Sequence, residues 1–386
     1  MMPSHYEIKY LDDGKEHINY AGEYDLVAIT ALTPKASRAF EIADEFRKRG
    51  KYVVMGGPHA SVLPEDAARH ADSVFVGEAQ FSWNDFIEDF MQGHPKPVYN
   101  GAGRYAAMTE SPVPRYDLLN MENYKIIPVE TTRGCPHDCE FCSSTKLWGR
   151  SYRRKNVAQV IREIEEVKRY ANNKFLFFVD DNMFVQREFS YELLKAIRKY
   201  KLRWFAQSDI SVSDDDKLLD LIYQAGCREL LIGFETISPD NLKTLDSSQW
   251  KLKQLARYPS AIEKIQAEGI SIYGSFILGL DHDDESVFQR TRDFIINTNL
   301  LGFQILVMTP IPGTRVHERL KKENRLYPVK DWGTYSTYQL NYELKKMSRD
   351  TFEKGMLWLF RELYSEEAFN KRKMHYLKLI RNLKKS

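Results

Sequence analysis

The sequence is poor in cysteine. Its 386 residues contain four, and three of these lie close together, at Cys135, Cys139 and Cys142. A disulfide framework needs cysteines that can pair across the fold, and this distribution does not supply them; it is typical of a reducing compartment. We therefore expect a cytoplasmic protein.

The sequence also lacks long apolar runs and an excess of charge of one sign. No run approaches the roughly 20 apolar residues that a membrane-spanning helix needs, and the N-terminus has no apolar signal-peptide core. Lys and Arg (56) nearly balance Asp and Glu (54), so no overall field favours nucleic acid or a membrane as partner. With 43% hydrophobic and 28% charged residues, the composition is that of a globular protein long enough for two domains and a tail.

The clustered cysteines form a C-x3-C-x2-C pattern inside Val129–Ser143, VETTRGCPHDCEFCS. Three thiolates at this spacing can hold three irons of a [4Fe–4S] cluster and leave the fourth iron open to a ligand. The alternatives are three unrelated cysteines or a zinc site, but zinc usually takes four nitrogen or sulfur ligands. His137 could be a fourth ligand only in a strained loop, and Cys227 lies far away and is interpreted as a small buried hydrophobe.

With Phe141 before the last cysteine and the apolar run Ile126–Val129 ahead of it, the motif resembles the signature of radical S-adenosylmethionine (SAM) enzymes. The resemblance implies that SAM binds the open iron through its amino and carboxylate groups. It also implies that a reduced cluster cleaves SAM to methionine and a 5′-deoxyadenosyl radical, which takes a hydrogen atom from a carbon. A small-molecule substrate, such as a lipid or natural-product intermediate, and a flavodoxin- or ferredoxin-type electron donor follow from the same resemblance.

Residues 1–95 alternate strand and helix patterns, which predicts a parallel sheet in a Rossmann-like α/β domain. Ligands of such sheets bind at the carboxyl ends of the strands. The expected strands are Tyr6–Leu11, Tyr24–Leu32, Tyr52–Gly57 and Ser73–Glu78, and the expected helices are Lys35–Gly50 and Gln80–Gly93.

The stretch from Ile29 to Gln80, with its GGPH and GE turns, resembles the cobalamin-binding domain that precedes many radical SAM domains. The chain has no D-x-H-x-x-G motif, so the resemblance implies cobalt without a histidine ligand. Against the family pattern the domain lacks a first strand and helix, and the C-terminal segment is short. Either the shortened domain binds cobalamin or it is purely structural. The residues implied to line the cobalamin site are Thr30, Gly56, Gly57, His59 and Glu78.

Residues 96–125 are rich in Pro, Gly and Asn and are expected to form a linker. Six strand–helix pairs follow over residues 126–324, which predicts a partial (β/α)6 barrel with its active site at the carboxyl strand ends. A short α-rich segment, residues 325–386, completes the chain. The expected barrel strands are 126–132, 174–181, 203–210, 229–236, 271–280 and 302–310.

The strand ends of this barrel supply the expected SAM site. Asp180 ends the second strand, where its carboxylate can pair with the SAM amino group. Glu235 in GFET and Ile277 in GSFILG resemble family segments that reach SAM and pack along its adenine, and Phe141 is placed with them. Asp181 is a helix cap or a further ligand. No catalytic residue is assigned.

The C-terminal segment carries an aromatic set, Trp332, Tyr335, Tyr338 and Tyr342, expected to cover the barrel mouth or to pack on the barrel side. Lys371–Lys385 is a basic amphipathic helix, which is expected to be solvated rather than bound to a membrane.

The combined resemblance implies cobalamin-dependent C-methylation of an unactivated carbon. A cobalamin-linked cyclisation or rearrangement enzyme is an alternative, as is a non-catalytic iron–sulfur protein. A methylthiotransferase would need three more cysteines in the N-terminal domain, and residues 1–134 contain none.

Overall fold

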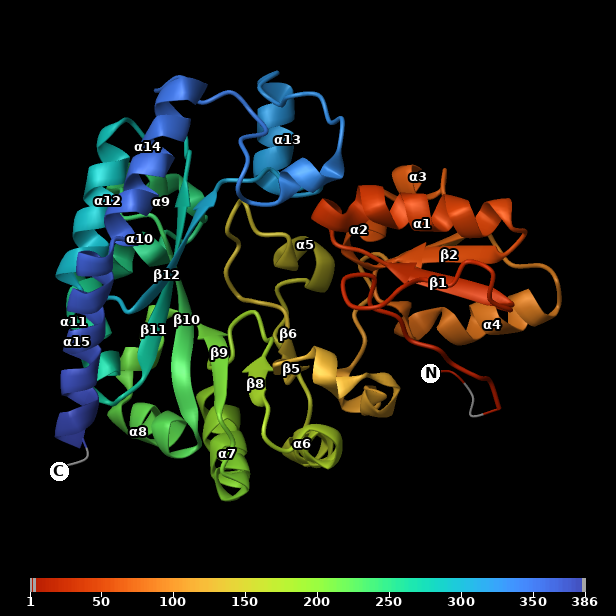
Figure 1. Cartoon of the computed structure of the whole chain (residues 1–386), viewed down its shortest axis with the longest axis horizontal. Coiled ribbons are helices and arrows are strands. Elements are labelled where there is room, and N and C mark those ends of the chain that lie inside the picture. Colours follow the sequence, from red (N-terminus) through yellow and green to blue (C-terminus); the bar gives the residue numbers. More distant parts are fainter. Residues whose placement is uncertain (1, 3–4, 384–386) are drawn as a thin grey trace.

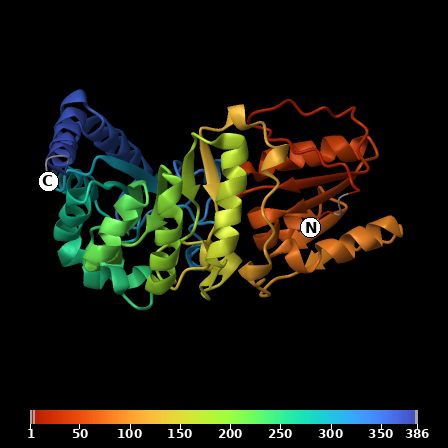
Figure 2. The ribbon, with the colours of Figure 1, turned by 90° about the horizontal axis from the view of Figure 1, so that it is seen from below.

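The chain folds into two α/β units that lie side by side in the computed structural model, which describes residue 2 and residues 5–383 (Figures 1 and 2). The N-terminal unit lies beside the β5 end of a larger six-stranded sheet. The C-terminal helices cover the opposite side of that sheet.

The N-terminal sheet has four parallel strands in the order β1-β2-β3-β4. Because side chains alternate along a strand, Val53 and Met55 pack with α1 and α2, while Val54 packs with Phe86 of α4 on the other face. The expected Rossmann-like unit is therefore present. Its elements are β1 (Leu26–Thr30), α1 (Ala36–Lys48), β2 (Tyr52–Gly56), α2 (Gly57–Val62), α3 (Pro64–Ala67), β3 (Ser73–Val76), α4 (Trp83–Met91) and β4 (Val98–Asn100).

Two predictions for this unit are wrong. Tyr6–Leu11 forms no strand, because it has no neighbouring strand to pair with. Val98–Asn100, inside the predicted linker, is the strand β4 and pairs with β3. Three residues are too few for a periodicity to show in sequence. The rest of the predicted linker carries short 3-10 turns, Met108–Glu110, Tyr116–Leu118 and Met121–Asn123.

All six barrel strands are present as predicted, parallel and in the order β5-β8-β9-β10-β11-β12. Since β5 and β12 do not pair, the sheet is an open, partial (β/α)6 barrel. The strands are β5 (Ile126–Val129), β8 (Phe175–Phe178), β9 (Trp204–Ser208), β10 (Cys227–Glu235), β11 (Ser271–Leu278) and β12 (Gly302–Val307). The helices between them are α6 (Val157–Ala171), α7 (Arg187–Ile197), α8 (Asp216–Gln224), α9 (Pro239–Leu245), α10 (Trp250–Gln254), α11 (Tyr258–Ala267) and α12 (Ser286–Asn297).

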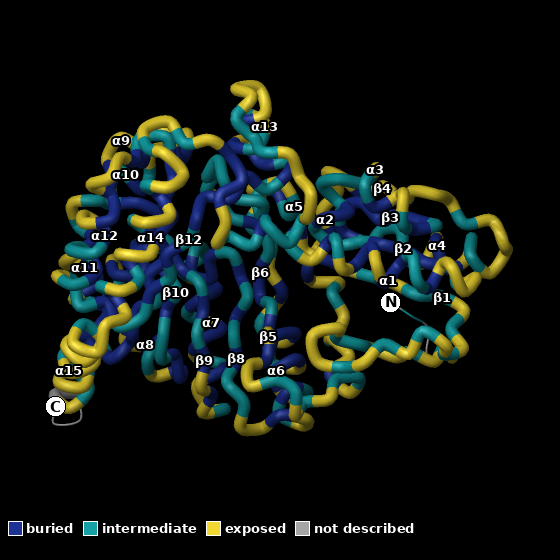
Figure 3. Tube along the Cα trace, turned by 45° about the horizontal axis from the view of Figure 1, so that its top comes forward, coloured by how far each residue is buried: buried dark blue, intermediate teal, exposed yellow. Residues whose placement is uncertain are grey.

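Buried and half-buried residues alternate along β8, β9 and β12 of the six-stranded sheet (Figure 3). Residues such as Leu176 and Trp204 belong to one large core with the outer helices. The alternate residues, such as Phe177 and Phe205, stack on each other at 4.4 Å and stay only half-buried. At β8 and β9 the inner face is therefore the more accessible one, as the active face of such a barrel should be.

The C-terminal segment contains α13 (Arg315–Lys322), a 3-10 turn (Trp332–Tyr335), α14 (Arg349–Leu363) and α15 (Glu366–Leu383). α14 packs on α12, and α15 packs on α11. The predicted basic helix is part of α15, although residues 384 and 385 lie outside the described part of the chain. Among the described residues, no helix is long and apolar enough to cross a membrane.

The expected aromatic set does not form one patch. The Trp332 and Tyr335 rings pack together at 5.2 Å, and Trp332 contacts the N-terminal unit. Tyr342 is buried and its hydroxyl donates to the Gly279 carbonyl, whereas Tyr338 is 65% exposed. The four side chains contact different neighbours. They therefore form neither the single cover over the barrel mouth nor the single patch on the barrel side that the sequence predicts.

Candidate active site

The three clustered cysteines lie on a loop at the carboxyl end of β5, closed at its neck by a two-stranded ribbon. The ribbon pairs β6 (Thr132–Arg133) with β7 (Arg153–Arg154) in antiparallel fashion. Residues 134–152 between these strands hold the cysteines and the short helix α5 (Ser144–Trp148). The loop is therefore held at both ends, on the edge where the barrel chemistry is expected.

Asp180, which follows β8, fixes the start of this loop. Its carboxylate accepts hydrogen bonds from the Thr131 amide (2.7 Å), the Thr131 hydroxyl (2.8 Å) and the Thr132 amide. The residue is fully buried, and burial raises its pKa to about 7 although these bonds act in the opposite direction. Both oxygens are occupied, so the predicted contact with a SAM amino group does not fit this geometry.

Glu140 attaches the middle of the loop to two other elements. Its amide donates to the Leu245 carbonyl at the end of α9 (2.8 Å), and its carbonyl accepts from the Val316 amide in α13 (3.0 Å). Its carboxylate pairs with Arg319 at 2.9 Å. The chain between the cysteines is thus held by both α9 and α13.

The cysteines are partly buried, and burial raises the pKa of Cys135 and of Cys139 to about 12. Among described residues, no group of three or more His, Cys, Asp or Glu side chains is gathered as for a single metal ion. The His137 ring has other partners, with Nε2 3.1 Å from Asp209 and the ring 4.7 Å from Trp250. Three thiols on one loop, without that histidine, are the donor set that a cluster with an open iron requires.

Cys227 lies at the start of β10, at the amino edge of the sheet. It is fully buried, and its thiol donates to the Glu229 carbonyl at 3.3 Å. Its interpretation as a small buried hydrophobe is confirmed.

Glu235 ends β10 with a φ of 63°, a left-handed conformation that is unusual for a residue other than glycine. Such strain is found mostly at functional sites. Its carboxylate pairs with Lys251 Nζ at 3.0 Å, and Lys251 also donates to the Gly233 carbonyl. Lys251 was missed in the sequence because a lysine on a helix with neighbouring lysines carries no distinguishing pattern.

Ile277 shares the inner face of the barrel with Ser275, whose hydroxyl accepts a hydrogen bond from Gln304 at 2.9 Å. It is 7% exposed and pairs in register with Leu306. Phe141 packs partly buried against the main core. The contacts of Ile277, Phe141 and Glu235 with SAM stay predictions.

Three of the residues predicted for cobalamin meet at the carboxyl ends of β1 and β2. Thr30 is exposed, and a Cβ at Gly57 would overlap the Thr30 hydroxyl. Gly57 also has a φ of 85°, so glycine is required for both reasons. With Gly56 before it, this forms a narrow backbone ledge, and Leu32 beside it is 59% exposed. We call Thr30, Leu32, Gly56 and Gly57 the ledge.

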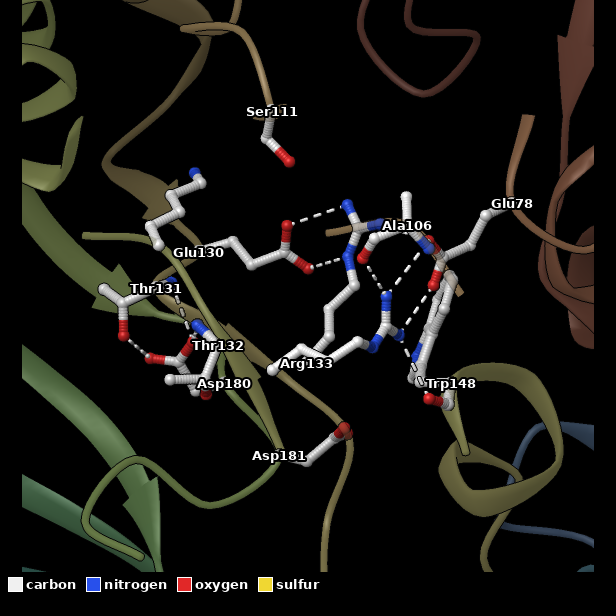
Figure 4. Close-up of polar contacts among 12 residues, drawn as sticks. Glu78, Ala106, Ser111, Glu130, Thr131, Thr132, Arg133, Trp148, Asp180 and Asp181 are labelled. Atoms are coloured by element: carbon white, nitrogen blue, oxygen red, sulfur yellow. Dashed lines mark hydrogen bonds and ion pairs between the residues drawn. The ribbon is translucent and has the colours of Figure 1, made fainter. Parts of the chain in front are cut away.

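His59 and Glu78 do not belong to the ledge, so their predicted place in the pocket is wrong. His59 is 1% exposed and lies edge-on between Phe40 and Trp332, and burial lowers its pKa. The Glu78 carboxylate is enclosed between Arg153 (2.7 Å) and Arg133 (3.4 Å), the second of which is labelled with it in Figure 4. Both side chains are enclosed by residues distant in sequence, Trp332 for His59 and Arg153 for Glu78. No local sequence pattern reveals such partners.

An open six-stranded barrel with a three-cysteine loop after its first strand defines a radical SAM enzyme, and residues 129–295 match the radical SAM superfamily. The chain is 33% identical over 356 residues to bacteriochlorophyllide d C-12(1)-methyltransferase from Chlorobaculum tepidum, covering 90% of this chain and 76% of the relative. It is 28% identical over 397 residues to bacteriochlorophyllide d C-8(2)-methyltransferase from the same organism, covering 99% and 87%.

The chain therefore belongs to the radical SAM superfamily, and its relatives there are named as methyltransferases. The predicted family, the enzyme class, and the [4Fe–4S] cluster and SAM as cofactors are confirmed. Enzymes of this family act on small-molecule substrates and need a reductant.

Two solved structures share the fold of both units. Radical SAM methyltransferase TsrM from Kitasatospora setae, with cobalamin and a [4Fe-4S] cluster bound, has a TM-score of 0.67 at 17% identity, covering 81% of this chain and 69% of that one. The cobalamin-dependent SAM radical enzyme OxsB, with aqua-cobalamin bound, has a TM-score of 0.69 at 16% identity, covering 86% and 57%. At these identities the likeness concerns the fold.

Proposed function

We propose that this protein is a cobalamin-dependent radical SAM methyltransferase that methylates an unactivated carbon of a bulky, mostly apolar organic molecule. The observation that carries the proposal is the ledge, where exposed Thr30 and Leu32 flank two glycines at the carboxyl strand ends of a Rossmann-like unit that adjoins the cysteine loop (Figure 1). Relatives named for methylation of bacteriochlorophyllides, and a hopanoid C-2 methylase 26% identical over 284 residues, support methyl transfer and this substrate class.

The ledge suits a flat, bulky ligand. Paired glycines let such a ligand approach the backbone, and exposed Leu32 offers an apolar contact. The enclosure of His59 agrees with a cobalt that takes no histidine from this turn. Thr30, Gly56 and Gly57 are therefore the residues we assign to cobalamin, whereas His59 and Glu78 support the walls behind them.

The cluster supplies one electron for the cleavage of SAM, and cobalamin supplies the methyl group. Cys135, Cys139 and Cys142 hold the cluster. Glu235, kept in place by Lys251, binds polar groups of SAM, and Ile277 packs along its adenine. We propose a flavodoxin- or ferredoxin-type protein as the electron donor.

The radical step is tested without knowing the substrate. The protein is reconstituted anaerobically with iron and sulfide, then given dithionite and SAM, and 5′-deoxyadenosine is measured. We expect product from the wild type and from Cys227→Ala, whose thiol is buried away from the loop, and none from Cys139→Ala. An intact cluster that yields no 5′-deoxyadenosine would refute the enzymatic function.

Cobalamin binding is tested by incubation with hydroxocobalamin, desalting and absorption spectroscopy. We expect the wild type to retain the cobalt chromophore and Leu32→Glu to lose most of it, because the change places a charge on the ledge. Met91→Glu is the matched control, since Met91 is equally apolar and 64% exposed but ends α4 at the opposite edge of the sheet. A wild-type protein that retains no chromophore would contradict the cobalamin assignment.

A further inference from the structure

The two-stranded ribbon that closes the cysteine loop is held by a side chain of the N-terminal unit, Glu78. Glu78 follows β3, and its carboxylate lies near Arg133 of β6 (Figure 4) and pairs with Arg153 of β7. Arg153 donates to both of its oxygens, at 2.7 and 3.2 Å, and Arg133 approaches to 3.4 Å. Because Arg133 and Arg153 are themselves a register pair of the ribbon, one carboxylate holds both ends of residues 134–152.

The Glu78 carboxylate has little freedom to move. Its side chain is 1% exposed, and it also accepts the Ala106 amide at 2.9 Å. Gly77 before it has a φ of 80°, and a Cβ there would lie 2.9 Å from the Gly101 backbone. This tight turn at the end of β3 aims the glutamate at the ribbon.

The two arginines are oriented as firmly as the glutamate. Arg153 donates to the carbonyls of Ala106 (2.7 Å) and Trp148 (3.0 Å). Arg133 forms a bidentate pair with Glu130, at 2.7 and 2.9 Å. Arg133 therefore keeps a carboxylate when Glu78 is removed, whereas Arg153, 13% exposed, is left with carbonyl partners. Bidentate, charge-assisted bonds of this kind fix geometry as well as supplying energy.

Asp180 holds the same neck from the barrel side, through Thr131 and Thr132. The loop start is thus fixed to β8 by one buried carboxylate and to the N-terminal unit by another. The two anchors come from different units, so the position of the loop depends on how these units are joined.

We propose that Glu78 is a positioning residue for the cysteine loop. By binding Arg133 and Arg153 it fixes the cysteine loop, which holds the cluster, to the N-terminal unit. It also fixes the position of that loop relative to the ledge. The second part rests on the proposed function, since it concerns what the ledge binds, whereas the first part does not.

The test compares Glu78→Ala and Glu78→Gln with Asp66→Ala. Asp66 accepts the Trp332 indole N–H at 2.9 Å, so its removal also breaks a contact between the N-terminal unit and the rest of the chain, but it leaves the loop untouched. Hydrogen exchange is first measured on the metal-free proteins. We expect amides in residues 134–152 to exchange about ten- to a hundredfold faster in Glu78→Ala, less so in Glu78→Gln, and unchanged in Asp66→Ala.

The same variants are then reconstituted, and bound iron and the electron paramagnetic resonance signal of the reduced cluster with SAM are recorded. We expect less iron and a changed signal in both Glu78 variants only. Wild-type exchange, iron and signal in both would overturn the proposal. If Glu78→Ala fails to fold, Glu78→Gln, which keeps the shape of the side chain, decides. A wild type that retains no cobalamin would refute the proposed function while leaving this comparison valid.

Discussion

Asp180 joins the second barrel strand to the start of the cysteine loop through a fully buried carboxyl group. Burial raises its pKa from 3.8 to about 7, so the folded protein binds this proton more tightly than the unfolded chain does. The contribution of Asp180 to stability is therefore fully present below about pH 4 and is lost as the pH rises through about 7.

This titration disappears in Asp180→Asn, which keeps the size of the side chain and one acceptor oxygen. We expect the free energy of unfolding of the wild type to fall relative to that of the variant between about pH 4 and 7, by at most about 4 kcal/mol. Urea unfolding at a series of pH values measures the difference. Parallel pH profiles for the two proteins would show that Asp180 is ionised in the folded state.

Glu235 and Lys251 are a buried ion pair, 12% and 8% exposed, so the charge of each side chain is compensated by the charge of the other. Glu235→Gln leaves a buried ammonium and Lys251→Met leaves a buried carboxylate, and each should cost about 3–5 kcal/mol of stability. The double variant should cost less than the sum of the two. Urea unfolding of all four proteins gives this coupling, and simple additivity would mean that the two groups do not interact.

At the scale of elements, periodicity was enough to predict the six barrel strands and their helices, because each strand is an apolar run between amphipathic helices. Along Tyr6–Leu11, half-buried Tyr6 and Ile8 alternate with exposed Glu7 and Lys9. A strand, however, needs a partner as well as a pattern, and Tyr6–Leu11 has none. The roles of His59 and Glu78 could not be predicted, because Trp332 and Arg153, which enclose them, are distant in sequence.

The turn Trp332–Tyr335 is an element whose effect can be measured. Trp332 packs edge-on against His59 at 5.0 Å, donates its indole N–H to Asp66 and donates its backbone N–H to the Ser37 hydroxyl oxygen. Trp332→Ala should lower the free energy of unfolding by about 2–4 kcal/mol. Calorimetry measures this, with Trp358→Ala on the surface of α14 as control. Equal effects of the two changes would mean that the turn does not hold the N-terminal unit.

At the scale of the whole molecule, the N-terminal unit is joined to the rest by contacts at separate places. The carboxylate of Glu78 meets the ribbon at the neck of the cysteine loop, and Trp332 meets α1 and α2 from the C-terminal side. Each contact keeps the two units close together, so each raises the effective concentration at which the other forms. The sequence predicts the order of the two units but not these contacts, because the residues that form each contact are far apart along the chain.

This linkage predicts how the units separate. Glu78→Gln and Trp332→Ala should each leave one cooperative unfolding transition, because the remaining contact still holds the N-terminal unit. The double variant should split into two transitions and lose more stability than the sum of the single changes, since neither of these two contacts then helps the other to form. Calorimetry with hydrogen exchange of β1 to β4 distinguishes this from a single transition with additive losses. A single transition with additive losses would mean that the two units are held together instead by the packing of Val62 in α2 against Gly313.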